Sequence, residues 1–250
     1  MHYASMLAPV VREILSDKFH DGDADDWAMT APTHQAIPCA ANLLCWSIAD
    51  LLKILQTVVN IRHQRGTPSA PGSPEAAKFR DYSQLSFDDR IDSLRFFEYQ
   101  MSEDSKFTGR RVVFINDINV TGAQQRDMER YFQKLGAATV DWVYLFTVDS
   151  ALGKGFPQLE YELNQSRVPS PEEFMKMLAA GEIQYTTKCV ARIMECDANE
   201  FAGILRVLSE PQRETLRQMV TEERRYAGDA FSERVEFLKS YLRNAASTIL

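Results

Sequence analysis

Residues 111–125 read Arg-Val-Val-Phe-Ile-Asn-Asp-Ile-Asn-Val-Thr-Gly-Ala-Gln-Gln, and this stretch predicts the fold. The apolar run at 112–115 is typical of a strand buried in a parallel sheet, and the amphipathic pattern of residues 124–135 predicts a helix after it. A polar turn is expected between them, at residues 116–123. Ligands of open α/β sheets bind at the carboxyl ends of the strands, so we expect Asp117 to face a ligand.

The Thr121-Gly122 pair in the same turn adds a second feature. Backbone N–H groups at the start of a helix form a site for anions. A carboxylate binds hydroxyl groups, and the neighbouring N–H groups bind a phosphate. The combination predicts a site for a phosphorylated sugar.

A strand–helix–strand unit is expected upstream of this stretch. Residues 27–31 and 57–61 have strand character, and the mostly apolar residues 39–55 between them predict a buried helix. Such a unit pairs its strands in parallel. The loop after the first strand, Pro32–Pro38, would then lie at a carboxyl end. We therefore expect three of its side chains to share the ligand crevice of Asp117, namely Thr33, His34 and Gln35.

A second candidate anion-binding segment follows residue 61. Arg62 and Arg65 precede residues 67–74, which are rich in Pro, Gly and Ser. One interpretation is a lid whose arginines close over an anionic ligand and exclude water. A surface loop with solvated charges is the alternative, and the sequence leaves both open.

The last third of the chain has helical periodicity and few strand signals. The sequence therefore predicts an α/β fold with a parallel sheet flanked by helices and a helical C-terminal extension, divided into an α/β domain at 1–165 and a helical region at 166–250. The expected C-terminal helices are Pro171–Leu178, Tyr185–Met194, Asn199–Leu208, Glu210–Tyr226 and Phe231–Leu242.

Composition excludes several classes of function. The chain has 28 Lys and Arg against 35 Asp and Glu, and the resulting net charge of −7 disfavours sequence-independent binding to nucleic acid. The longest apolar region, residues 36–61, contains Asn, Asp, Lys and Gln, so no membrane span is expected. The four cysteines form no CxxC motif, and we expect reduced thiols and a cytoplasmic protein.

The pattern at residues 112–124 resembles the phosphoribosyl-diphosphate (PRPP) signature of the type I phosphoribosyltransferase family. The shared features are four apolar residues, an acid-type pair, three variable residues, then Thr-Gly and a small residue. The stretch is also similar to that of phosphoribosyltransferase-like proteins in bacterial stress and tellurite-resistance gene clusters. The resemblance implies transfer of a 5-phosphoribosyl group to or from a nitrogenous base or nucleotide-like acceptor, as in nucleotide metabolism.

The resemblance also implies roles for individual residues. Asn116 and Asp117 take the positions of the acid pair that holds the ribose hydroxyls, and Asp117 would contact Mg²⁺ indirectly, through the ribose-bound ion. Pro32–Ala36 would form the pyrophosphate loop, and Arg62–Arg65 would begin the mobile catalytic loop. The loop that binds the 5′-phosphate, here called the phosphate loop, would comprise Val120, Thr121, Gly122, Ala123 and Gln124.

Two positions depart from the family pattern. Asn116 replaces the first acid, and Gln124 stands where the family commonly has Thr or Ser. Loss of one carboxylate weakens the electrostatic stabilisation of a transition state with oxocarbenium character. A regulator or binding module that keeps the phosphosugar pocket without turnover is therefore an alternative to an active enzyme.

A phosphatase of the haloacid dehalogenase (HAD) type is a further alternative. Residues 117–121 have the spacing of the D-x-D-x-T motif of that family, with Asn119 in place of the second Asp. The sequence specifies neither the acceptor base nor the oligomeric state, and a homodimer is among the assemblies left open.

Overall fold

The computed structural model describes residues 2–16, 26–65, 85–86, 88–90, 97–100, 106–165, 170–181 and 183–247. The chain divides into two compact units, which are described separately. The α/β unit comprises residues 1–33 and 40–167, and the helical unit comprises residues 34–39 and 168–250. The segment His34–Cys39, which we expected within the α/β domain, thus belongs to the helical unit.

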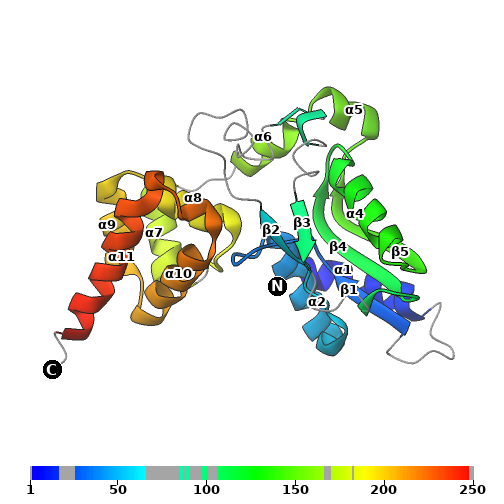
Figure 1. The fold of residues 1–250 in the computed structure, drawn as a ribbon, viewed down its shortest axis with the longest axis horizontal. Helices are drawn as coiled ribbons and strands as arrows, with labels where there is room; N and C mark the ends of the chain where they lie inside the picture. Colours follow the sequence, from blue (N-terminus) through cyan, green and yellow to red (C-terminus); the bar gives the residue numbers. More distant parts are fainter. Residues whose placement is uncertain are drawn as a thin grey trace. The chain divides into compact units, whose positions relative to one another are not determined.

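A three-stranded parallel sheet forms the centre of the α/β unit (Figure 1). Its strand order is β1-β4-β5, with β1 at Trp27–Thr30, β4 at Arg111–Asn119 and β5 at Thr139–Thr147. Thr30 pairs with Phe114, and Asn116 pairs with Tyr144. The parallel sheet flanked by helices confirms the predicted fold class.

Strand β4 is longer than the sequence suggested. The expected polar turn at residues 116–123 was wrong in its first half, because β4 continues through Asn119. The reason is the length of β5, whose residues up to Thr147 pair with these polar residues and satisfy their backbone groups. The expected second strand at residues 57–61 was also wrong. It is reduced to a 3₁₀ turn, η2 (Leu55–Thr57), and one parallel bridge between Val58 and Met29.

Successive side chains of β4 point to opposite faces of the sheet and pack into two apolar clusters. Val113 and Ile115 pack in a cluster with buried side chains of α1 (His2–Ser16) and α2 (Ala40–Leu52). Val112 and Phe114 pack on the other face against Met128 and Phe132 of α4 (Ala123–Lys134). The apolar run that predicted a buried strand is therefore buried on both faces.

The remaining elements of the α/β unit are short. Strands β2 (Arg62–Arg65) and β3 (Phe97–Gln100) form a separate antiparallel pair, and helices α5 (Ser150–Gly155) and α6 (Leu159–Gln165) follow β5. The buried guanidinium of Arg90 forms a salt bridge to Glu160 of α6 at 2.7 Å and donates to the carbonyl of Pro157 at 2.6 Å. This arginine ties the segment before β3 to α6.

Four helices of the helical unit begin at capping residues. Ser170 and Ser209 each form a capping box, with Pro in the first turn of the helix that follows. Thr186 caps the helix that begins at Thr187, and Asp197 caps the helix that begins at Ala198. The predicted helices are present, although α10 ends at Glu222 and a 3₁₀ turn, η6 (Arg224–Tyr226), follows it. The bounds are α7 Pro171–Ala179, α8 Thr187–Glu195, α9 Ala198–Val207, α10 Glu210–Glu222 and α11 Asp229–Ser247.

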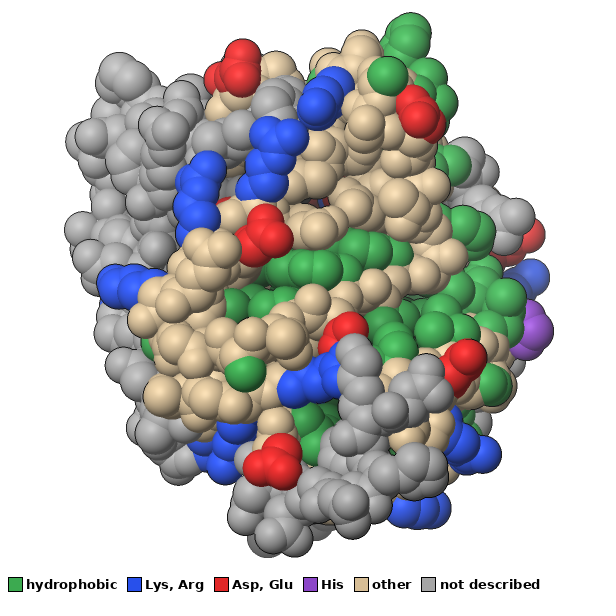
Figure 2. All heavy atoms as spheres, turned by 90° about the vertical axis from the view of Figure 1, so that its right-hand side faces the viewer, with side chains coloured by type: hydrophobic (Ala, Val, Ile, Leu, Met, Phe, Trp, Pro, Cys, Tyr) green, Lys and Arg blue, Asp and Glu red, His purple; other side chains and the backbone are tan. Residues whose placement is uncertain are grey.

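Apolar side chains remain exposed near β5. Phe146 exposes 60% of its surface, and Leu152 of α5 exposes 48%. Figure 2 faces the side of the molecule where β5 lies in Figure 1, and hydrophobic side chains gather across the middle of that face. Exposed apolar patches of this kind are typical of contact surfaces. The homodimer remains a prediction.

All four cysteines are free thiols. None of the helices in the described ranges combines the length and the apolar composition that crossing a bilayer requires.

Candidate functional site

The candidate site lies where β4 ends and α4 begins. Gly122 is the residue before the helix, and its φ of 73° is in the left-handed region that favours glycine. Gly122 has no side chain that could accept a hydrogen bond from the N–H groups of the first helical turn. The structure brings the predicted residues Asn116, Asp117 and 120–124 together here.

Asn116 and Gln124 contact each other directly. The Nδ2 group of Asn116 donates to Oε1 of Gln124 at 2.9 Å and to the carbonyl of Ile118 at 3.4 Å, and its Oδ1 accepts from the N–H of Asp117 at 2.9 Å. Asn116 is only 5% exposed. Since both the nitrogen and the oxygen of its amide form hydrogen bonds within the protein, Asn116 supports the structure of the site.

Asp117, unlike Asn116, has a side-chain oxygen that forms no hydrogen bond with the described part of the protein. It follows Asn116 on β4, so its side chain leaves the strand on the other face. Its Oδ1 accepts from the N–H of Ile118 at 2.9 Å, and the second oxygen has no protein partner among the described residues. Burial raises the pKa of Asp117 above its usual value, although hydrogen bonds from the Ile118 and Asp117 backbone oppose the shift. One carboxylate oxygen is therefore left for a ligand.

A set of polar side chains fixes the path of the phosphate loop. Asn119 accepts from the N–H of Gly122 at 3.0 Å and donates to Oε1 of Gln125 at 3.2 Å. The hydroxyl of Tyr144 on β5 donates to the same Gln125 oxygen at 3.0 Å. Burial raises the pKa of Tyr144 well above its usual value, so the hydroxyl keeps its proton. The contact of Asn119 with Gly122 fixes the loop to the end of β4, and the contacts of Gln125 fix the start of α4 to β4 and β5.

The phosphate loop keeps part of its anion-binding capacity. The N–H groups of Gly122 and Ala123 are used internally, by Asn119 and by the hydroxyl of Thr121 at 3.3 Å. Within the described part of the chain, no acceptor is found for the N–H groups of Thr121 and Gln124. Two donors at the positive end of α4 are thus available for an anion.

Helix α5 touches this loop through a glycine. A Cβ atom on Gly153 would lie 1.7 Å from the carbonyl oxygen of Val120 and 2.7 Å from its carbon. Only a residue without a side chain fits there. The backbone of α5 therefore lies directly against the phosphate loop.

The upstream loop is arranged differently from the expectation. Thr33 follows β1, whose end pairs with Phe114, and so lies at the same edge of the sheet as Asp117. His34 and Gln35 belong to the helical unit. His34 is buried there, and Gln35 accepts from the N–H of Arg224 at 3.3 Å. A crevice shared by these three residues and Asp117 stays a prediction.

Glu223 occupies the backbone donors of this upstream loop. Its Oε2 accepts from the N–H of Ala36 at 3.1 Å and from that of Ile37 at 3.2 Å. The side chain of Ile37 is buried in the core of the helical unit, and the N–H of Thr187 donates to the carbonyl of Pro38 at 2.9 Å. Consecutive N–H groups of this kind form an anion site, and here a carboxylate of the same chain fills it.

The predicted lid is only partly described. Arg62 and Arg65 lie in β2, so the chain is extended where we expected the mobile loop to begin. Residues 67–74 lie outside the described ranges. The role of these arginines in binding an anion remains a prediction.

A magnesium ion would have few ligands from the protein itself. Among the described residues, no group of three or more His, Cys, Asp or Glu side chains is placed to hold a metal. Mg²⁺ commonly uses one or two carboxylates together with water and substrate phosphates. The free oxygen of Asp117 fits an ion carried mainly by a substrate.

Several residues of the site were missed by sequence reasoning. Asn119 had a local signal, because Asn often accepts a backbone N–H in a turn that follows it. Tyr144, Gly153 and Glu223 had none, since they reach the two loops from other elements of the fold.

Comparison with known proteins is consistent with this geometry. A family model described as PRTase ComF-like matches residues 24–238, which include Asp117 and the whole phosphate loop. The match is to a phosphoribosyltransferase-like family and gives no support to the HAD alternative. A search of curated proteins finds no match. Because the matched residues make up most of the 250-residue chain, this protein belongs to the PRTase ComF-like family.

Proposed function

We propose that this protein binds PRPP, or a ribose 5-phosphate conjugate, together with Mg²⁺ and transfers the 5-phosphoribosyl group to or from a nitrogenous base or nucleotide-like acceptor. The observation that carries the proposal is the free oxygen of Asp117, three residues before a phosphate loop with two available N–H donors. Membership of a phosphoribosyltransferase-like family supports it.

In this proposal Asp117 binds the ribose. Its free carboxylate oxygen accepts hydrogen bonds from the ribose hydroxyl groups, and its negative charge stabilises the positive charge that develops on the sugar in the transition state. Burial strengthens such an interaction, because the local dielectric constant is lower than that of water. The protein here supplies one carboxylate where two are common in the family.

The phosphate loop binds the other end of the sugar. The N–H groups of Thr121 and Gln124 donate to the 5′-phosphate, and the positive end of α4 favours its negative charge. Fixing the ribose at both ends places C1 in a defined position. Orientation of this kind contributes a large part of catalysis in transfer reactions.

Transfer then exchanges one bond at C1 for another. The bond from C1 to the pyrophosphate oxygen breaks and its electron pair leaves with the pyrophosphate. A nitrogen lone pair of the base forms the new bond to C1, and that nitrogen gives its proton to the departing pyrophosphate or to water. When bound, Mg²⁺ neutralises charge on the leaving pyrophosphate.

The proposal is tested by titration calorimetry with PRPP and Mg²⁺, together with a pyrophosphate-release assay across nucleobases. Asp117→Asn should weaken binding by about tenfold or more, since hydrogen bonds to a charged group contribute about 1.5–3 kcal/mol. Glu129→Gln removes an exposed carboxylate of α4 and should bind as the wild type does. An unchanged affinity of the Asp117→Asn protein would contradict the assignment.

A binding module without turnover is the second candidate. Two observations favour it: the amide of Asn116 is consumed by Gln124, and Glu223 already occupies the N–H groups of Ala36 and Ile37. By resemblance, this loop would bind the pyrophosphate that an active enzyme releases. Binding of PRPP without release of pyrophosphate for any base tested would support this candidate over the enzyme.

A further inference from the structure

We propose that Gly153 of α5 is a positioning residue of the phosphate loop, and that α5 holds the Val120–Thr121 peptide in the orientation that aims the Thr121 N–H at a phosphate. The inference rests on the proposed function, because it assigns the phosphate to residues 120–124. It concerns a helix that has no counterpart in the sequence signature.

The peptide group between Val120 and Thr121 has a defined direction. The carbonyl oxygen of Val120 points at Gly153, since a Cβ there would lie 1.7 Å from it. A trans peptide places its N–H opposite its carbonyl. The N–H of Thr121 therefore points away from α5, and it has no acceptor within the described part of the chain.

Hydrogen bonds fix the start of α5 in place. The N–H of Val148 donates to the carbonyl of Asn119 at 2.8 Å, so the chain before α5 is fixed to the end of β4. Asp149 then caps the helix by accepting from the N–H groups of Ala151 at 3.0 Å and Leu152 at 3.1 Å. Gly153 follows directly. Both sides of the contact between Gly153 and Val120 are thus connected to the same strand end.

A side chain at position 153 would disturb this contact. A methyl group at position 153 meets backbone atoms, which cannot rotate away as a flexible side chain can. Either α5 or the phosphate loop must then move by about 1 Å or more, and a misplacement of that size is enough to cost about 100-fold in a precisely arranged site.

The test compares two glycines of the same helix. Gly153→Ala meets Val120, whereas Gly155→Ala has nothing within 4 Å of the added carbon. Two ligands are titrated, each with Mg²⁺: ribose 5-phosphate, which needs the phosphate loop, and inorganic pyrophosphate, which does not. We expect Gly153→Ala to weaken ribose 5-phosphate binding at least tenfold, to leave pyrophosphate binding within twofold, and Gly155→Ala to change neither.

A milder variant covers the case in which Gly153→Ala does not fold. Asp149→Ala loosens the start of α5 without a clash, and Asp197→Ala removes an equivalent cap from α9 in the helical unit. Asp149→Ala should weaken ribose 5-phosphate binding several-fold, and Asp197→Ala should not. The inference is overturned if Gly153→Ala binds ribose 5-phosphate as the wild type does, or if both ligands are lost equally. Failure of the wild type to bind either ligand would instead overturn the proposed function.

Discussion

The side-chain amide of Asn116 donates a hydrogen bond to Oε1 of Gln124 at 2.9 Å, so the two residues that depart from the family signature are partners of each other. Alternation along β4 explains the contact, because Asn116 continues the series of Val112 and Phe114, which face α4. A carboxylate at position 116 would meet the side-chain oxygen of Gln124 and the carbonyl of Ile118. The two departures therefore form one coupled change.

The coupling is expected to appear in a double-mutant cycle. Asn116→Ala, Gln124→Ala and the double variant are compared by the free energy of unfolding in urea. A hydrogen bond between two partly buried amides should give a coupling energy of about 0.5–1.5 kcal/mol. Strictly additive losses would mean that the contact contributes nothing to stability.

Restoring the family residues at positions 116 and 124 should work only when both are changed together. Asn116→Asp alone should lower stability, because the new carboxylate loses two donated hydrogen bonds and faces two carbonyl oxygens. Combining it with Gln124→Thr should recover stability and raise PRPP affinity above that of the single variant, as measured by calorimetry. A double variant that binds no better than Asn116→Asp would speak against coupled evolution of the two positions.

Asp117 should make stability depend on pH in a defined direction. Its pKa in the folded state is raised above 3.8, chiefly by burial, so the folded protein holds this proton more tightly than the unfolded chain does. The stabilisation is complete below 3.8 and is lost as the pH rises through the folded pKa. Asp117→Asn should therefore gain melting temperature over the wild type between pH 4 and pH 7. Glu129→Gln serves as the exposed control, and a gain that shrinks with rising pH would refute the burial argument.

Gly122 should matter for binding beyond its effect on stability. An alanine there must adopt a φ near 73°, which costs about 1–2 kcal/mol, and Gly181 provides a matched site in the helical unit at 69°. Neither position has an atom within 4 Å of an added Cβ. Both alanine variants should lose similar stability, and only Gly122→Ala should lose affinity for ribose 5-phosphate. Equal affinities would show that the phosphate loop tolerates the altered backbone.

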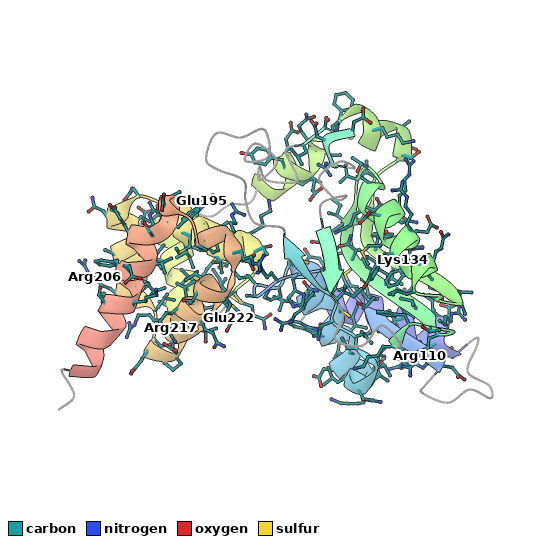
Figure 3. The ribbon with its side chains drawn as sticks, in the orientation of Figure 1. Arg110, Lys134, Glu195, Arg206, Arg217 and Glu222 are labelled. Carbon is teal, nitrogen blue, oxygen red and sulfur yellow. The ribbon has the colours of Figure 1, made fainter. Side chains whose placement is uncertain are left out.

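Glu223 should stabilise the helical unit more than its neighbour does. Glu223→Ala leaves the N–H groups of Ala36 and Ile37 without their acceptor, which should cost about 1–3 kcal/mol in unfolding free energy. Glu222, labelled on α10 in Figure 3, is exposed and contacts only Gln218 among the hydrogen bonds seen, so Glu222→Ala should be nearly neutral. Similar losses in the two variants would contradict the role of Glu223.

Local sequence carried enough information for the buried strand, the helix after it and the C-terminal helices. Val112–Ile115 are buried because both faces of β4 are covered, and Ser170 and Ser209 begin helices because their hydroxyls cap them. The polar residues up to Asn119 were misassigned, since their extended form depends on pairing with β5. Local sequence does not show which strand from a distant segment will pair with these residues.

The residues of the candidate site were likewise predicted only in part. Asp117 and the Thr121–Gly122 turn could be found because each has a chemical role that depends on residue type. Gly153 and Tyr144 could not, because their effect depends on which elements the fold brings against the loop. The assignment of His34 and Gln35 to the helical unit likewise follows from packing of Ile37 into a core built from residues far along the chain.

That packing of Ile37 and the acceptance of its N–H by Glu223 affect how the protein forms on the ribosome. The segment 34–39 leaves the exit tunnel long before Glu223, which is synthesised 187 residues after Ala36. Domains generally begin to fold as soon as their residues emerge. Until Glu223 is synthesised, the nascent chain must therefore carry an apolar side chain and two N–H groups without their acceptor in the segment that connects β1 and α2. Truncation of the chain before Glu223 would therefore leave a defect in the segment 34–39, far in sequence from the missing residues.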